Sequence, residues 1–243
     1  MDEARKEKEL VGRYACRFVN DGQILGLGSG STVAHFVRAL GRKIKEEEIT
    51  IHAIPTSYQI KFVAMKAGIP LTTLMEHRRI DVDIDGADEI DPELNLMKGA
   101  SASAFTVEKI VAEASDRFII IADHRKLVKR LGVRFPVPVE VLPDAHRIVA
   151  VKLEEMGAMT RLRTRADSSG LAQPLITENG NIVLEARFRD VADPEKTGME
   201  IKSVTGVVEH GLFSGMADTV CVARKNKVRV MERGRQTSSD TVE

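Results

Sequence analysis

The chain has 243 residues, which corresponds to one large domain or to one domain with a smaller companion. Its 36 basic and 36 acidic side chains balance and only 4% of its residues are aromatic, so a nucleic-acid surface is not indicated. The N-terminus, MDEARKEKEL, lacks a signal peptide's apolar stretch, and Cys16 and Cys221 form no CxxC pair. We therefore predict a cytoplasmic protein that binds neither nucleic acid nor a membrane.

Short apolar strands alternate with amphipathic helices in the first half of the chain. After a helix at 3–19, strands are predicted at 24–27, 49–54, 80–84 and 118–122, with helices at 32–40, 59–66 and 107–114. Strands separated by helices form parallel βαβ units. The fold class predicted is therefore α/β, with a doubly wound, mostly parallel, Rossmann-like sheet. Ligands of such sheets bind beyond the carboxyl ends of the strands.

The pattern changes after Gly132. The prolines of PVPVEV disfavour the centre of the first sheet. The next elements predict a smaller α+β domain of ferredoxin-like, split βαβ type. They are a helix near 145–156, strands at 159–163 and 182–188 with the turn ENGN before the second of them, and a helix near 194–201. We predict a catalytic α/β domain at 1–132 plus 208–233, to which GVVEHGLF and TVCVAR return, a small domain at 133–207 and a flexible tail at 234–243.

A loop of small residues, GLGSGST at 26–32, follows the first strand. Its backbone N–H groups, its hydroxyls and the start of the next helix could bind a phosphate group. The third glycine of the dinucleotide fingerprint is replaced by Ser31, and no P-loop lysine follows. A tight strand–helix turn with a serine or threonine cap explains the same residues.

Carboxylates and lysines follow the later strands. Asp85 and Asp88 could bind sugar hydroxyls, act as acid and base, hold Mg²⁺ or Mn²⁺, or lie in a solvated turn. Lys98 and Glu108 are the minimal set for enolisation, a lysine near the developing oxyanion and a carboxylate base. Lys126 follows the fourth strand. Each alone could be an ordinary surface residue, but together they converge on one edge of the sheet.

This combination resembles the type A ribose-5-phosphate isomerase family. The resemblance runs from about Lys8 to about Val230 and is carried by GLGSGSTVAHFV, DIDGADEIDPELNLMKG, EKIVAEASDRFIIIAD, KLVKRLG, PVPVEVLP, LITENGNIVLEARF and GVVEHGLF. It implies interconversion of D-ribose 5-phosphate and D-ribulose 5-phosphate in the non-oxidative pentose phosphate pathway. It also implies a homodimer or homotetramer that uses neither a metal nor an organic cofactor.

The resemblance also implies a role for each candidate residue. Glu108 is the base that moves a proton between C2 and C1, Lys98 stabilises the enediolate oxygen, and Asp85 and Asp88 contact sugar oxygens and assist ring opening. The substrate-binding residues, with the phosphate held chiefly by the first five, are Lys8, Ser29, Gly30, Ser31, Thr32, Gly99, Ala100, Ser101 and Lys126.

The segment after Lys98 departs from the family pattern. The family's glycine run is mostly replaced, Val107 stands where an arginine is usual, and the segment is one residue longer. We expect the loop between Gly99 and Ala104 to absorb the extra residue. The pattern Val107, Ile110, Val111 and Ala114 then predicts the buried face of the helix, with Glu108 at its edge.

Two other functions compete with the isomerase. A non-catalytic sugar-phosphate sensor of the same fold would need an added DNA-binding module or a lost base, whereas Glu108 is present. Another enzyme of similar fold, such as an amino-sugar phosphate deaminase or a CoA transferase, is disfavoured because DGADE, Lys98-Gly99 and Lys126 occur together.

Overall fold

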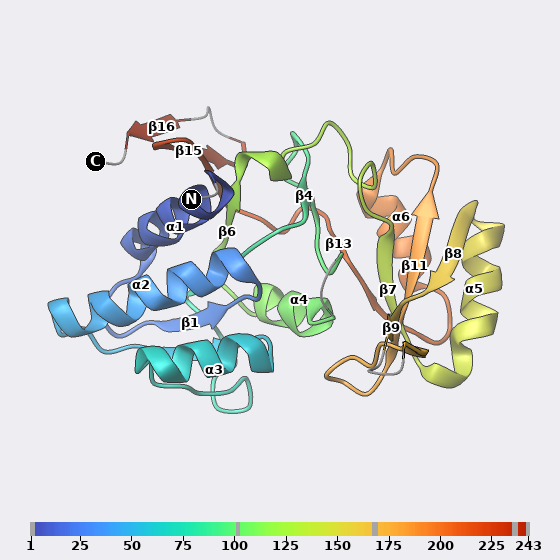
Figure 1. Cartoon of the computed structure of the whole chain (residues 1–243), viewed down its shortest axis with the longest axis horizontal. Coiled ribbons are helices and arrows are strands. Elements are labelled where there is room, and N and C mark those ends of the chain that lie inside the picture. The colour runs from blue at the N-terminus through green and yellow to red at the C-terminus, as the bar shows by residue number, and fades with distance from the viewer. Residues whose placement is uncertain (1–2, 101–102, 167–169, 235–237, 242–243) are drawn as a thin grey trace. The chain divides into compact units, whose positions relative to one another are not determined.

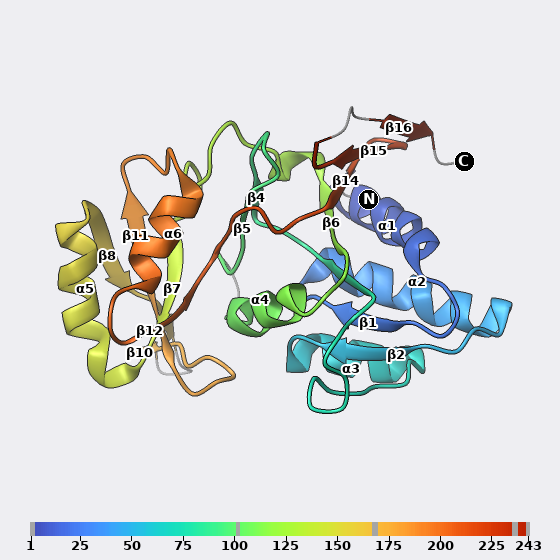
Figure 2. The ribbon, with the colours of Figure 1, turned by 180° about the vertical axis from the view of Figure 1, so that it is seen from behind.

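The computed structural model describes residues 3–100, 103–166, 170–234 and 238–241. By the contacts between Cα atoms the chain divides into two compact units (Figures 1 and 2). The first unit comprises Met1–Ala87, Val107–Lys126 and Met216–Glu243. The second unit comprises Asp88–Thr106 and Leu127–Gly215.

A seven-stranded sheet forms the centre of the first unit, in the order β16-β15-β14-β6-β3-β1-β2. Neighbouring strands from β14 to β2 are parallel, and β15 and β16 extend the sheet in antiparallel fashion. The strands are β1 Ile24–Leu27, β2 His52–Pro55, β3 Val82–Asp85, β6 Phe118–Asp123, β14 Thr219–Arg224, β15 Lys227–Glu232 and β16 Ser238–Thr241. The predicted mostly parallel sheet is confirmed.

Helices cover both faces of this sheet. They are α1 Glu3–Ala15, α2 Ser31–Glu47, α3 Tyr58–Ala67 and α4 Phe105–Glu113, with 3-10 turns η1 Cys16–Phe18 and η2 His124–Lys126. Leu25 and Leu27 of β1 share a core with α1 and α2. Strand side chains alternate between faces, and a Cβ on Gly26 would lie 2.6 Å from Val111 Cγ1 of α4. Helix α4 therefore packs on the opposite face, so the sheet is doubly wound.

The second unit is built around a four-stranded antiparallel sheet in the order β12-β7-β11-β8. Its elements run β7 Val137–Val141, η3 Pro143–Ala145, α5 His146–Glu155, β8 Ala158–Leu162, β11 Ile182–Phe188, α6 Pro194–Lys202 and β12 Val207–His210. Smaller sheets contain β4 Glu89–Ile90, β5 Leu96–Met97 and β13 Leu212–Phe213, and β9 Thr164–Ala166 with β10 Ala172–Pro174. The β-α-β-β-α-β order confirms the ferredoxin-like prediction.

Several predicted elements have different ends. The strand predicted at 49–54 is shortened to β2, and the helix predicted at 32–40 continues to Glu47. Helix α2 continues through Gly41, where a Cβ would lie 2.6 Å from the Ala67 carbonyl oxygen of α3. The absence of a side chain at this glycine therefore allows α2 and α3 to approach closely, and α2 remains unbroken there.

The segment GVVEHGLF, predicted to return to the first domain, lies in the second unit and does not join the first sheet. Its residues form β12, which pairs with β7, and β13, which pairs with β5. Gly211 separates these strands, and a Cβ there would lie 2.2 Å from the Lys98 carbonyl oxygen. Both pairings depend on free edges of β7 and β5, which lie far from this segment in the sequence. TVCVAR does form β14 in the first sheet, as predicted.

The predicted domain boundaries differ from the division into units. Residues 88–106, 127–132 and 208–215 lie in the second unit, although the sequence assigned them to the catalytic domain. Part of the expected flexible tail also differs, because Ser238–Thr241 forms β16 and pairs with the edge of β15. Its polar composition gave no sign of this backbone pairing. The assignment of catalytic and small domains to 1–132 plus 208–233 and 133–207 stays a prediction.

Candidate active site

The loop after β1 lies directly against the end of β3. Gly28 donates its N–H to the Ile84 carbonyl oxygen at 3.0 Å, and Ser29 donates its N–H to Asp85 Oδ1 at 3.1 Å. A Cβ on Gly28 would lie 1.9 Å from Asp85 Cγ. The predicted phosphate loop and the first carboxylate of DGADE are therefore in contact. This is the expected result for the carboxyl ends of neighbouring parallel strands.

Hydroxyl groups gather beside this loop. Ser29 Oγ lies 2.9 Å from Thr56 Oγ1 and donates to Ser57 Oγ at 2.6 Å. Thr56 and Ser57 follow β2, and Ser57 also caps α3 by accepting the Ile60 N–H at 3.3 Å. The sequence analysis assigned no role to these two residues. Their position after the next parallel strand was the signal available for finding them.

The start of α2 has the features of an anion site. Gly30 precedes the helix with a φ of 102°, in the left-handed region that favours glycine. Lys8 of α1 donates from Nζ to Ser31 Oγ at 3.0 Å, and Thr32 is buried in the first turn. The first N–H groups of a helix carry positive partial charge and lack partners within the helix. A lysine, hydroxyls and N–H groups therefore meet at one point, which is the chemistry that a phosphate group requires.

Backbone N–H groups fix the two aspartates of DGADE, Asp85 and Asp88. Asp85 is fully buried, and its Oδ1 also accepts the Gly86 N–H at 2.6 Å. In the second unit, Asp88 donates its N–H to the Met97 carbonyl oxygen at 2.8 Å, and its Oδ2 accepts the Ala100 N–H at 2.8 Å. The Asp88 contact connects DGADE to the segment after Lys98. Both side chains are thus oriented before any ligand binds.

Lys98 and Gly99 lie in a tightly held part of the second unit. Lys98 is 3% exposed and donates its N–H to the Gly211 carbonyl oxygen at 2.8 Å, and its Nζ lies 5.6 Å from the centre of the Phe213 ring. Gly99 has a φ of 80°, and a Cβ there would lie 2.4 Å from Phe105 Cδ1. Two independent constraints therefore require glycine after this lysine.

Arg163 is a buried cation that the sequence analysis missed. Its Nη1 donates to the Gly99 carbonyl oxygen at 2.7 Å, and its Nε donates to Glu185 Oε1 at 3.0 Å. Burial raises the pKa of Glu185, but hydrogen bonds from Arg161 and Arg163 outweigh it, so this pKa lies below its usual value. An ionised Glu185 therefore holds the guanidinium that fixes the backbone next to Lys98.

Glu108 is buried in α4. Its exposed fraction is 4%, and the helix also buries Phe105, Val111 and Ala112. The predicted buried face was wrong at Ile110, which is 52% exposed, whereas Val107, Val111 and Ala114 pack with Ile54 and Ile80 as a helical face should. The helix is covered along a second stripe, which the single-face periodicity did not anticipate. Glu108 lies on that second stripe rather than at an exposed edge.

A second buried carboxylate anchors the start of α4. Glu140 of β7 is fully buried, and its Oε2 accepts the hydroxyl of Thr106. Its Oε1 accepts Thr177 Oγ1 at 2.7 Å, Asn179 Nδ2 at 3.1 Å and Asn181 Nδ2 at 2.9 Å. The polar residues of LITENGN therefore saturate a carboxylate that binds the first turn of the helix carrying Glu108. The sequence analysis used LITENGN only as a family block.

Lys126 lies half-buried in η2, directly after β6. This turn is held by Asp123, whose Oδ1 accepts Arg125 Nε at 2.7 Å. Burial raises the pKa of Asp123, but the hydrogen bond and charge of Arg125 outweigh it and lower the pKa below its usual value. The carboxylate is thus ionised and keeps the turn in place.

The predicted site residues fall into both units. Contacts within the first unit join Lys8 with Ser31, and Ser29 with Asp85. A contact within the second unit joins Asp88 with Ala100. Helix α4 begins at Phe105, after the longer segment, and the predicted substrate contact Ser101 lies outside the described residues. The functional roles of all these residues stay predictions.

Two searches of the described residues bear on metal and membrane binding. Within this part of the chain, no group of three or more His, Cys, Asp or Glu side chains is arranged to hold a metal ion. Nor does any of its helices combine the length and the apolar character needed to cross a membrane.

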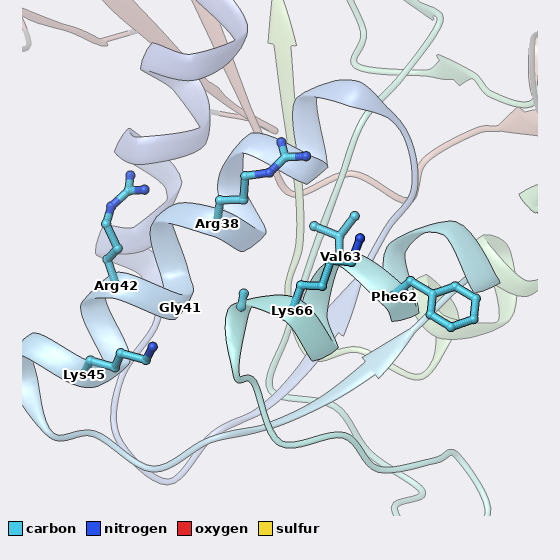
Figure 3. Close-up of a pocket in the computed structure, with 8 residues that line it drawn as sticks. Arg38, Gly41, Arg42, Lys45, Phe62, Val63 and Lys66 are labelled. Carbon is cyan, nitrogen blue, oxygen red and sulfur yellow. The ribbon is translucent and has the colours of Figure 1, made fainter.

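A cavity of about 410 Å³ lies between α2 and α3 of the first unit. Figure 3 shows it beside the helices that carry its lining residues, which are Arg38, Gly41, Arg42, Lys45, Phe62, Val63, Lys66 and Ala67. None of these is a predicted site residue, and none belongs to the loops after β1 and β3. The cavity is therefore separate from the Ser29–Asp85 contact.

Substituting Gly28 tests the contact between the phosphate loop and Asp85. Gly28→Ala is expected to lower the free energy of unfolding by about 1–3 kcal/mol, because the added methyl group overlaps the carboxylate. Gly86→Ala is the control, since its Cβ would meet no atom closer than 3.8 Å. Denaturant unfolding of both variants measures the difference. Equal stabilities would contradict the close approach of the two strand ends.

Comparisons with known proteins place these features in one family. The sequence profile of "Ribose 5-phosphate isomerase A (phosphoriboisomerase A)" matches residues 52–227. Ribose-5-phosphate isomerase A of Methanothermobacter thermautotrophicus is 45% identical over 224 residues, covering 92% of this chain and 96% of that relative.

Solved structures agree with the sequence comparisons. Ribose 5-phosphate isomerase A of Methanocaldococcus jannaschii superimposes with a TM-score of 0.88 at 42% identity, covering 93% of this chain and 98% of that one. A D-ribose-5-phosphate isomerase in complex with phospho-erythronic acid gives a TM-score of 0.90 at 40% identity, covering 96% and 100% of the two chains. Both matches extend through the two units. This chain therefore belongs to the ribose 5-phosphate isomerase A family.

Proposed function

We propose that this protein is a ribose-5-phosphate isomerase, which interconverts D-ribose 5-phosphate and D-ribulose 5-phosphate. The observation that carries the proposal is the match, along almost its whole length, to relatives that bear this name. A structural relative bound to phospho-erythronic acid, a phosphorylated sugar acid, supports a sugar phosphate as the substrate class. The buried carboxylates of Asp85 and Glu108 are consistent with proton-transfer chemistry.

The phosphate group of the substrate is proposed to bind at the start of α2. Lys8 supplies a cation there, Ser31 and Thr32 supply hydroxyls, and Gly30 with the first turn of α2 supplies backbone N–H groups. Ser29 belongs to the same loop, with its own N–H donated to Asp85. Lys126, from the turn after β6, adds a second cation. Binding at this remote group would orient the reacting carbons, so phosphate contacts contribute to turnover as well as to affinity.

The reaction proposed is a proton transfer between adjacent carbons. Glu108 takes the proton from C2 of the open-chain aldose, which leaves an enediolate whose negative charge lies on the C1 oxygen. A proton passes from the C2 hydroxyl to the C1 oxygen, and Glu108 then returns the first proton to C1 as the C2 oxygen becomes the ketose carbonyl. Lys98 stabilises the oxyanion, and Asp85 and Asp88 bind the sugar oxygens and assist ring opening. Gly99, Ala100 and Ser101 are proposed to contact the substrate beside Lys98. Atoms and charge balance without a cofactor.

We also propose a cytoplasmic homodimer or homotetramer. Both cysteines are free thiols, and burial raises the pKa of Cys16 to about 11, so this thiol is protonated and unreactive.

Helix α3 exposes Tyr58, Phe62 and Met65 at the spacing of one helical face. An apolar face of this kind is typical of contact with another protein. Sedimentation of the purified chain would measure the number of subunits.

A turnover assay with and without chelator tests the proposed function. Purified protein is expected to produce ketose from ribose 5-phosphate at the same rate in EDTA, because the proposed groups require no metal. Unphosphorylated ribose should be a very poor substrate, since it lacks the group that the α2 site binds. Loss of activity in EDTA that Mg²⁺ or Mn²⁺ restores would assign Asp85 and Asp88 to a metal. Binding of ribose 5-phosphate without turnover would support the sensor alternative.

A further inference from the structure

Glu7 of α1 is a buried carboxylate that the proposed reaction does not use. It is 1% exposed, and its Oε2 lies 2.9 Å from His124 Nδ1 in η2. Its Oε1 accepts the N–H of Lys225, in the turn between β14 and β15, at 2.8 Å. The tautomer of His124 with its proton on Nδ1 donates to Oε2, which accepts. One side chain thereby attaches α1 to two loops that are distant in sequence.

The next residue on the helix makes a different connection. Consecutive residues of an α-helix point about 100° apart. Glu7 faces η2, whereas Lys8 reaches Ser31 at the start of α2. His124 precedes Lys126 by two residues in the same turn. The first turns of α1 therefore carry one of the lysines proposed to bind phosphate, Lys8, and contact the turn that carries the other, Lys126.

The energetics of this pair suggest a role in geometry. A buried carboxylate loses its hydration, and an ion pair in such a place contributes little stability compared with packed apolar side chains. The partner imidazole is itself 34% exposed, so water partly screens its interaction with the carboxylate. The contact does, however, fix direction and distance, because the two carboxylate oxygens have separate donors. The Glu7–His124 contact therefore fixes the position of η2 relative to α1.

We infer that Glu7 is a positioning residue for phosphate recognition, which acts through His124 on Lys126 and through α1 on Lys8. The inference rests on the proposed function, in which these lysines bind the phosphate group. Asp123 holds Arg125 independently of Glu7, so η2 can keep its fold when the link to α1 is removed. Loss of Glu7 or His124 should therefore move the two lysines relative to one another without unfolding the chain.

Four variants separate positioning from general stability. Glu7→Gln places an amide NH2 group against one of the two donors that the carboxylate accepts, and His124→Ala removes the partner. His124→Asn keeps an N–H near the position of Nδ1 and is the rescue variant. Glu9→Gln is the matched control, because Glu9 is exposed on the same helix. For each variant, kcat and KM for ribose 5-phosphate, the melting temperature, and the affinity for inorganic phosphate by phosphorus NMR titration are measured.

The expected result is a change in phosphate affinity that leaves the chemistry intact. Glu7→Gln and His124→Ala should raise KM and weaken inorganic phosphate binding by about three- to tenfold, as is usual for indirect coupling. kcat should fall less than KM rises, staying within about twofold, because both lysines remain and only a small part of the orienting phosphate contact is lost. His124→Asn and Glu9→Gln should behave like the wild type.

Other outcomes overturn the inference. A lower melting temperature with unchanged KM and unchanged phosphate affinity would make Glu7 a stability residue. A fall in kcat at constant KM would place its effect on the reacting carbons instead. If the wild type binds phosphate but does not isomerise the sugar, the proposed function fails, and the phosphate titrations still decide whether Glu7 positions the anion site.

Discussion

Replacing Glu108 with glutamine is expected to lower kcat by about 10²–10⁴-fold, the usual contribution of a positioned general base. Glutamine keeps the shape of the side chain but cannot accept a proton from carbon. Glu108 is 4% exposed, so a water molecule cannot readily take its place as the base. The phosphate group is proposed to bind elsewhere, at the start of α2, and the affinity for ribose 5-phosphate should therefore survive. Steady-state kinetics and calorimetric binding measure the two effects separately.

A second glutamate of the same helix provides the control for this experiment. Glu113 is exposed in the last turn of α4, and Glu113→Gln should leave kcat unchanged. A Glu108→Gln variant that retains near-normal kcat would transfer the role of base to Asp85 or Asp88. Loss of binding together with activity would instead indicate that Glu108 mainly organises the fold around α4.

The mostly parallel sheet and the positions of the strand-end loops could be predicted from the sequence. Alternating strands and helices imply a parallel sheet, and parallel strands bring their carboxyl ends to one edge. The contact between Ser29 and Asp85 follows from that rule, although 56 positions separate them in the sequence. Periodicity also identified α4 as a helix and three of the residues that pack it against the sheet, Val107, Val111 and Ala114.

The failures came from contacts that periodicity does not encode. A helical pattern identifies one buried face, but α4 is covered along two stripes. Glu108 lies on the second stripe and is buried, whereas Ile110 lies outside both and is exposed. Strand partners also depend on which edges remain open elsewhere. GVVEHGLF pairs with β7 and β5 for that reason, rather than extending the first sheet. Local composition contains no information about either effect.

Buried polar partners were the other features that the sequence did not reveal. Arg163, Glu140 and Glu7 read as ordinary charged residues along the chain, because nothing in their neighbourhoods marks them as buried. Each binds a segment far from it in the sequence: Gly99, Thr106 and His124, respectively. Their importance comes from the folded arrangement, which places a charged group beside the backbone or side chain that it fixes.

Lys98 is the second residue whose replacement should have a large effect. Its backbone is held by Gly211 on one side, and Arg163 holds the carbonyl group of Gly99 on the other. The positive φ of Gly99 and its contact with Phe105 further restrict this segment. A lysine on so rigid a support can present its ammonium group to a developing oxyanion with little reorganisation, which is the condition for strong electrostatic stabilisation.

Lys98→Met retains most of the aliphatic stem and removes the charge, so we expect kcat to fall by about 10²–10³-fold while the fold persists. The loss arises because the negative charge on the C1 oxygen develops during enolisation and is largely absent from the bound aldose. KM should therefore change much less than kcat. Lys129→Met, at an exposed position of the second unit, should leave both constants unchanged. If Lys98→Met raised KM with kcat intact, the lysine would bind the substrate in its ground state, and another group would have to stabilise the enediolate.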